Sequence, residues 1–165
     1  MSASSVPGSP SSSASTLTPQ RLFRIVAVAE AVTWTLLLTG MVLKYVTDTT
    51  EMGVRIGGMA HGVVFIAYCL TTITVGVDQR WSVRRILLGL VSSIPPFVTV
   101  WFDLAGERKG WFGQAWRLRA GAPRRPLEKV VSWLIREPGQ GAVAAVAAVA
   151  ALTCLALIVG PPASS

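Results

Sequence analysis

Histidine, cysteine and charged residues are all scarce in this chain of 165 residues. It has one histidine and two cysteines, and both cysteines fall inside apolar runs, so we expect no metal site and no cofactor. Only 14% of its residues are charged and 52% are hydrophobic, whereas soluble globular domains are about 25% charged. That much apolar surface needs lipid around it, so the composition predicts an integral membrane protein.

Acidic residues are few as well, with 8 Asp and Glu against 15 Lys and Arg, which gives a net charge of +7. The basic residues sit between apolar runs, where membrane proteins place cations that meet anionic lipid headgroups. We therefore expect the lipid bilayer as a partner and no nucleic acid.

Four apolar runs are long enough to cross the roughly 30 Å of bilayer hydrocarbon, which takes about 20 helical residues. The runs predict an all-α polytopic transmembrane helix bundle. Three core spans are expected at residues 22–43, 54–77 and 83–102, and a fourth, rich in alanine, at 141–160. The alternative for the fourth run is an alanine-rich helix that docks against the other three.

The remaining segments are polar or mixed. Residues 1–20 are rich in Ser and Pro without any charge, which predicts a disordered tail, and 161–165 form a second short tail. Residues 104–140 are basic and tryptophan-bearing, typical of a membrane interface. An amphipathic helix is expected at 126–137, with an apolar face of Leu127, Val130, Val131, Leu134 and Ile135. The basic loop 108–136 is a candidate contact for anionic headgroups.

The orientation in the membrane is left open by the charges. With four spans, five basic residues lie on one side and ten on the other, which favours external termini and a cytoplasmic third loop. The three cations between the second and third runs, and Arg21 and Arg24 before the first, argue for the opposite orientation.

One acid and one histidine fall in the interior of the predicted spans, away from their ends, and each has two readings. Glu30 is costly to place in lipid, so it either handles protons or ligands or forms an interhelical hydrogen bond. His61, the single histidine, either titrates in contact with water or bonds a neighbouring helix. Their different depths argue against a direct bond. Counted from the midpoint of each span, Ser92 and Ser93 lie at nearly the same depth in the bilayer as Glu30, and Thr39 and Thr99 at nearly the same depth as His61. These hydroxyls are therefore the expected hydrogen-bond partners.

Three further groups of residues have structural readings. Small residues on the second run predict close helix packing at Gly53, Gly57, Gly58 and Gly62. Two prolines predict a kink in the third span, at Pro95 and Pro96, with Ser92 and Ser93 repairing the broken helix or the break forming a binding site. Cations and aromatics at span ends are expected to anchor the chain in the membrane, namely Lys44, Tyr45, Arg55, Trp81, Arg84 and Arg85.

The order and spacing of several short motifs resemble a known family over residues 23–103. They are Phe23-Arg24-Ile25-Val26, Glu30, Lys44-Tyr45, Arg55, His61-Gly62, Tyr68, Trp81, Pro95-Pro96-Phe97 and Phe102-Asp103. The family consists of small bacterial integral membrane proteins and is known as domain of unknown function three-eight-one-seven. The resemblance implies a three-helix membrane unit in the bacterial plasma membrane and no known activity.

Function is weighed between two main hypotheses. The first is a non-enzymatic accessory or structural component, a homo-oligomer or part of a larger membrane complex. The alternative is a small proton-coupled carrier or ion pathway that uses Glu30 and His61. A membrane enzyme ranks last, because beyond Asp103, Glu107 and the basic loop no cluster of polar groups is evident.

Overall fold

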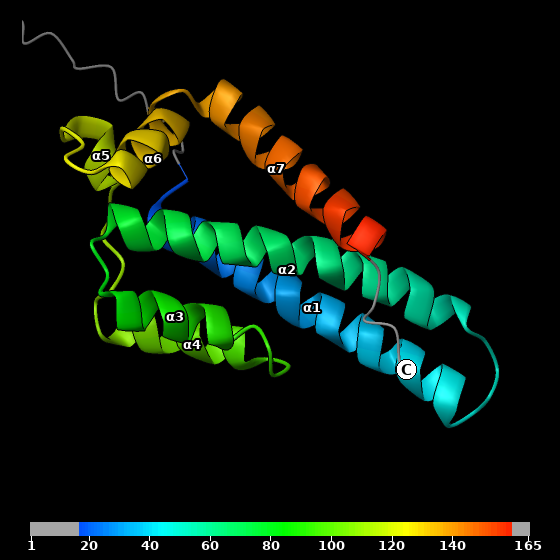
Figure 1. Ribbon diagram of the computed structural model, residues 1–165. Helices are drawn as coiled ribbons and strands as arrows, with labels where there is room; N and C mark the ends of the chain where they lie inside the picture. Colours follow the sequence, from blue (N-terminus) through cyan, green and yellow to red (C-terminus); the bar gives the residue numbers. More distant parts are fainter. Residues whose placement is uncertain (1–16, 160–165) are drawn as a thin grey trace, which may run out of the picture.

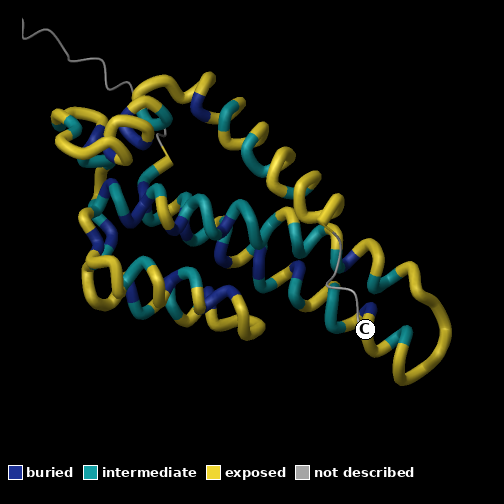
Figure 2. Tube along the Cα trace, in the orientation of Figure 1, coloured by how far each residue is buried: buried dark blue, intermediate teal, exposed yellow. Residues whose placement is uncertain are grey.

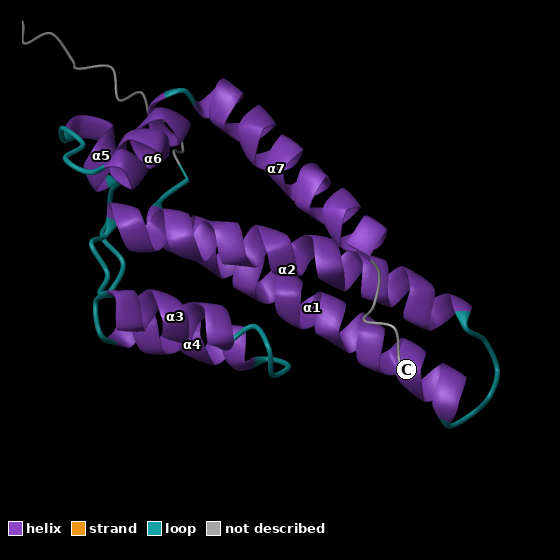
Figure 3. Cartoon of the chain, viewed as in Figure 1, coloured by secondary structure: helices purple, strands orange, loops and turns teal. Residues whose placement is uncertain are grey.

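The computed structural model describes residues 17–159, and within them every regular element is a helix (Figure 3). The helices are α1 (Pro19–Tyr45), α2 (Met52–Asp78), α3 (Val83–Val91), α4 (Val98–Arg108), α5 (Arg117–Ala120), α6 (Pro126–Arg136) and α7 (Pro138–Val159). The predicted all-helical membrane fold is confirmed. Three of these helices, α1, α2 and α7, are long and apolar enough to cross a membrane.

Helix α1 begins earlier than expected. The hydroxyl of Thr18 accepts a hydrogen bond from the backbone N–H of Arg21 at 3.2 Å, and Pro19 occupies the first helical position. Both are favoured at helix starts, because the first turn has backbone donors without helical partners. Residues 19 and 20 of the predicted disordered tail are therefore helical and Thr18 caps the helix, while residues 1–16 and the short tail 161–165 fall outside the described residues.

Helices α1 and α2 form an antiparallel pair in backbone contact. A Cβ atom on Gly40 would lie 2.4 Å from the carbonyl carbon of Gly53, and one on Gly57 would lie 3.0 Å from the Cα of Leu37. Gly53 and Gly57 thus lie where the backbones of α1 and α2 approach closely, opposite Gly40 and Leu37. A Cβ on Gly58 would meet only the tip of Leu37 at 3.8 Å, and one on Gly62 would meet nothing within 4 Å.

The predicted continuous third span, 83–102, is wrong. Helices α3 and α4 form a hairpin in which α3 packs on α2 and α4 packs on α1, and their connection lies partway along α1 and α2 (Figure 1). Pro95 and Pro96 supply no backbone donor, and Phe97 has φ +67°, so the chain reverses instead of kinking. The hydroxyls of Ser92 and Ser93 donate to the carbonyls of Gly89 and Leu90, both at 2.6 Å, and so satisfy the end of α3.

The basic segment folds into a small cap over one end of α1 and α2 (Figure 1). The cap consists of α5 and α6, and α6 matches the amphipathic helix expected at 126–137. Helix α7 follows it directly and slants back toward α2, which its C-terminal end approaches (Figure 1), and none of its most apolar 18 residues is buried (Figure 2). The fourth apolar run is therefore a helix of spanning length that touches α2 but leaves most of its surface exposed.

Aromatic side chains form the core, at the end of α1 and α2 nearest the cap. Phe23 is fully buried, and its ring centre lies 5.1 Å from that of Phe112, 5.4 Å from Tyr68 and 6.0 Å from Trp81. The indole N–H of Trp81 donates to the carbonyl of Trp111 at 2.9 Å. Trp81, expected to be a membrane anchor, is instead 6% exposed and belongs to this core.

Candidate intramembrane polar site

Glu30 lies fully buried on α1, facing the α3–α4 hairpin. Its Oε2 accepts a hydrogen bond from the Thr99 hydroxyl of α4 at 2.7 Å, and its Oε1 accepts one from the Trp34 indole at 2.8 Å. Trp34 is one helical turn further along α1, so the carboxyl group joins its own helix to the hairpin. Both oxygens therefore have donors, which offsets the cost of burying the group.

His61 contacts the same part of α1 from α2. Its Nδ1 lies 3.3 Å from the hydroxyl of Thr33, and its ring centre lies 4.4 Å from that of Trp34. No direct bond joins Glu30 and His61 among the contacts of the described residues, as their depths predicted. Trp34, which was not predicted as part of this site, contacts both residues. Its position four residues after Glu30 on the same helix could have indicated the contact between them.

The predicted hydroxyl partners are distributed differently. Thr99 bonds Glu30 and not His61, because α4 returns along α1 instead of crossing. Thr39 is exposed and donates to the carbonyl of Thr35 on its own helix. Ser92 lies 3.0 Å from the Tyr68 hydroxyl of α2, so it holds α3 in place and does not reach Glu30.

An ion pair fixes the hairpin at its open end. The Arg24 guanidinium of α1 lies 2.8 Å from a carboxylate oxygen of Asp103, whose side chain is 3% exposed. Arg24 also pairs with Glu107, which accepts a further bond from Gln20 at 2.8 Å. Asp103 and Glu107, the acids considered for an enzyme, are therefore engaged in holding α4 against α1.

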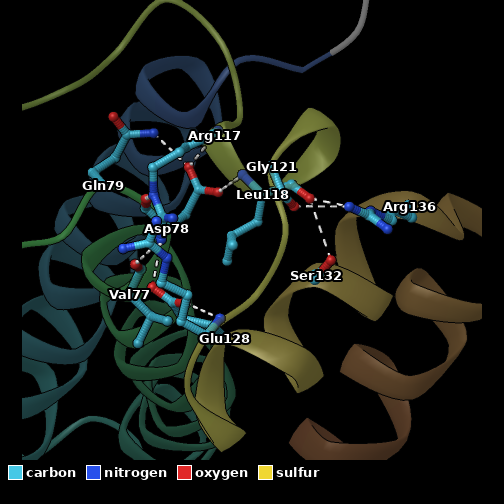
Figure 4. A network of polar contacts seen from close by, with 10 residues as sticks. Val77, Asp78, Gln79, Arg117, Leu118, Gly121, Glu128, Ser132 and Arg136 are labelled. Atoms are coloured by element: carbon cyan, nitrogen blue, oxygen red, sulfur yellow. Dashed lines mark hydrogen bonds and ion pairs between the residues drawn. The ribbon is translucent and has the colours of Figure 1, made fainter.

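A second buried acid, Asp78, joins the cap to the end of α2 (Figure 4). Its carboxylate accepts backbone N–H groups of Leu118 at 2.9 Å and Arg117 at 3.1 Å. Gln79 adds a bond from the N–H of Gly113 at 2.8 Å. The sequence reading missed Asp78, although an acid at the end of an apolar run and before a basic loop could have indicated such an attachment.

Glu128 of α6 closes the same network. It accepts the Arg124 backbone N–H at 2.7 Å and the Arg117 guanidinium at 2.8 Å (Figure 4). These two donors, the backbone N–H first, hold the pKa of Glu128 below its usual value. Arg136 donates to the carbonyls of Leu118 at 3.2 Å and Gly121 at 2.8 Å, so two cap arginines are used internally.

The predicted membrane anchors other than Trp81 lie near helix ends. Lys44 pairs with Glu51 at 3.1 Å and lies 5.3 Å from the Tyr45 ring centre, while Arg85 lies 4.6 Å from the ring centre of Trp111. Arg55 and Arg84 are exposed.

A large open groove lies away from the polar site. An apolar groove of about 1080 Å³ separates α2 from α7 and includes neither Glu30 nor His61 in its lining. Among the described residues, no three His, Cys, Asp or Glu side chains are grouped as metal ligands would be. The contacts around Glu30 thus join helices, and the large groove lies away from them.

These features define an all-helical membrane protein built on a tight helix pair with an inserted hairpin. The chain belongs to the family described as Domain of unknown function (DUF3817), which it matches over residues 20–108. That range spans α1 to α4 and leaves the cap and α7 outside.

A relative is the Streptomyces coelicolor protein named "Putative membrane protein SCO5905", 43% identical over 91 residues. The match covers 54% of this chain but only 11% of the relative, so the chain spans about a tenth of that protein's length. No solved structure matches the chain.

Proposed function

We propose that this protein is a non-enzymatic accessory component of a bacterial plasma-membrane complex. The observation that carries the proposal is the exposure of α7, whose most apolar 18 residues are not buried by the rest of the chain. The α1–α4 unit, by contrast, is internally bonded at Glu30, Tyr68 and Asp103. The chain thus combines a self-contained unit with a helix that has free faces.

The composition of α7 suits a helix partner. Transmembrane helices associate through close packing of small side chains, because lipid offers no hydrophobic drive between them. Small residues line the α7 side of the groove, including Gly141, Ala142, Ala145 and Ala150. The relative of Streptomyces coelicolor supports the same reading, because there the matched unit is joined to a much longer chain.

Site-specific photo-crosslinking tests the accessory role. A photoreactive residue replaces Val146 on α7, which is 70% exposed, and as a control replaces Ile25 on α1, which is 57% exposed. We expect a stoichiometric crosslink to a different membrane protein from position 146 and none from position 25. Crosslinks only to lipid from both positions would refute the proposal, and crosslinks only between copies of this chain would favour a homo-oligomer.

We further propose that the chain crosses the membrane three times, with its N-terminal side in the cytoplasm. Because the α3–α4 hairpin returns to the end where it began, all of the 15 basic residues except Lys44 and Arg55 lie toward the cap end. The positive-inside rule then assigns that end to the cytoplasm, and the conflict between the loops disappears. The count of basic residues that favoured external termini assumed a third span at 83–102, and the structure has a hairpin there.

Reporter fusions test this topology. Fusions after Gln79 and Arg119 are expected on the cytoplasmic side, and those after Thr49 and Ser165 on the outside. Opposite locations for Gln79 and Arg119 would restore a full third span and refute the three-span topology.

A second candidate, a small proton-coupled carrier or ion pathway, is favoured by one observation. Helix α4 begins partway along α1, with Thr99 of its first turn bonded to the carboxyl group of Glu30. Half-helices that begin within the membrane next to a polar site occur in transporters. Single cysteines at Glu30 and His61, with Cys69 and Cys154 changed to serine, would report water access. Labelling of both by a charged thiol reagent, but not of a cysteine at the exposed Val32, would favour this candidate.

A further inference from the structure

Part of the apolar surface of helix α6, a stripe of Leu127, Val130 and Trp133, points away from the protein. Glu128, Val131 and Ser132 face the protein at 7%, 6% and 3% exposure. Leu127 and Val130, by contrast, are 64% and 57% exposed. Trp133, one turn after Val130, is 45% exposed. Such a stripe would be unfavourable in water, so it fits the boundary between headgroups and acyl chains.

The position of α6 agrees with that boundary. Helix α7 starts two residues after α6 ends, and the backbones of the two helices touch where they meet. A Cβ atom on Gly141 would lie 2.2 Å from the carbonyl oxygen of Leu134. The exposed stripe therefore lies beside the start of a helix of membrane-spanning length.

Free cations flank the stripe. Of the cap's basic residues, Arg117 and Arg136 are bound to internal acceptors. Arg124, Arg125 and Lys129 are exposed and take part in none of the ion pairs formed among residues 17–159. Lys129 precedes Trp133 by four residues, so the two side chains are neighbours on the helix surface.

We propose that the outer face of the cap is a docking surface for anionic phospholipid. Arg124, Arg125 and Lys129 would pair with headgroup phosphates, while Leu127, Val130 and Trp133 enter the acyl boundary. An anionic membrane surface contributes about 1 kcal/mol for each nearby Lys or Arg, and apolar insertion adds to it. The surface is built from residues outside the polar site and does not depend on the accessory role.

Lipid titration of the full-length protein tests this surface. The delipidated protein in uncharged detergent is titrated with phosphatidylglycerol or phosphatidylcholine, and bound lipid is counted by native mass spectrometry. We expect preference for phosphatidylglycerol, and a roughly tenfold weaker first binding step in the double variant Arg124→Gln, Arg125→Gln. The matched control Arg21→Gln, Arg84→Gln removes two exposed charges from the same end and should lose at most about twofold.

Two results would overturn the proposal. One is an equal loss in the two double variants, which would mean that only the general charge of this end matters. The other is displacement of phosphatidylglycerol by millimolar inorganic phosphate, which would identify a site for free phosphate.

Depth measurement provides an independent check. A spin label on Val130→Cys, in protein lacking Cys69 and Cys154, should lie at the headgroup boundary of phosphatidylglycerol vesicles. A label on Gln114→Cys, at an exposed position in the loop before α5, should remain in water. Location of the Val130 label in bulk water would contradict insertion even if the protein still binds lipid.

Discussion

The carboxyl group of Glu30 is satisfied by two donors, and this makes its contribution to stability testable. Glu30→Ala removes the acceptor and leaves the Thr99 hydroxyl and Trp34 indole unpaired, so we expect a loss of about 2 kcal/mol in the free energy of unfolding. Glu30→Gln retains an acceptor and should lose less than half of that. Unfolding in mixed micelles, followed by circular dichroism, measures both variants. Equal losses would mean that the charge, and not the hydrogen bonds, matters at this position.

Glycine at position 40 is required by the backbone of the neighbouring helix. In Gly40→Ala the new methyl group would overlap the Gly53 carbonyl carbon, 2.4 Å away, so α1 and α2 must separate. We expect destabilisation of about 1–3 kcal/mol in the same assay. Gly62→Ala, whose Cβ meets nothing within 4 Å, should instead be neutral or stabilise by up to about 1 kcal/mol. Similar effects at both positions would contradict the backbone contact.

At the scale of elements, the α3–α4 hairpin depends on the ion pair between Arg24 and Asp103. Arg24→Gln leaves the buried Asp103 carboxylate without its cation, and we expect a loss of about 2–3 kcal/mol in the free energy of unfolding. Lys44→Gln breaks a pair whose Glu51 partner is 73% exposed, and should leave the free energy of unfolding nearly unchanged. Micelle unfolding compares them, and an equal loss would show that the hairpin is held by its apolar contacts.

The attachment of the cap should depend on pH through Glu128. Because folding lowers the pKa of Glu128, its stabilising contribution is fully present above the unfolded value of about 4.3. It is lost as the pH falls from there through the lowered folded pKa. Hydrogen exchange of residues 117–136, corrected for intrinsic rates, should therefore accelerate below about pH 4.3. Glu128→Gln should remove this dependence, while Glu137→Gln, a control outside the network, should retain it.

The elements also show where sequence reasoning ended. Apolar length and amphipathic spacing predicted α1, α2, α6 and α7, because these properties are local. Pro95 and Pro96 correctly marked a break in the third run, but a kink and a reversal have the same local sequence. The reversal depends on contacts distant in sequence, such as Thr99 with Glu30 and Asp103 with Arg24. The prediction that Thr99 lies near His61 assumed a straight third helix, so it could not anticipate the contact with Glu30.

On the scale of the whole molecule, the same break changes the interpretation of charge. A continuous third span places the basic loop opposite Arg80, Arg84 and Arg85, and the loops then disagree about orientation. A hairpin places them at one end, so a single tertiary feature makes nearly all basic residues consistent. The positions of the basic residues along the chain are known from the sequence, but only the fold shows which of them lie at the same end of the molecule.

Removing α7 separates the two parts of the molecule. A chain that ends at Glu137 should retain the unfolding free energy of the α1–α4 unit within about 2 kcal/mol, because α7 touches α2 but its apolar stretch is not buried against it. It should, however, lose the protein that crosslinks or copurifies through α7. Micelle unfolding and affinity purification measure the two effects in one preparation. Loss of stability with retention of the partner would make α7 a structural part of the bundle, and the partner protein would then have to contact α1 or α2.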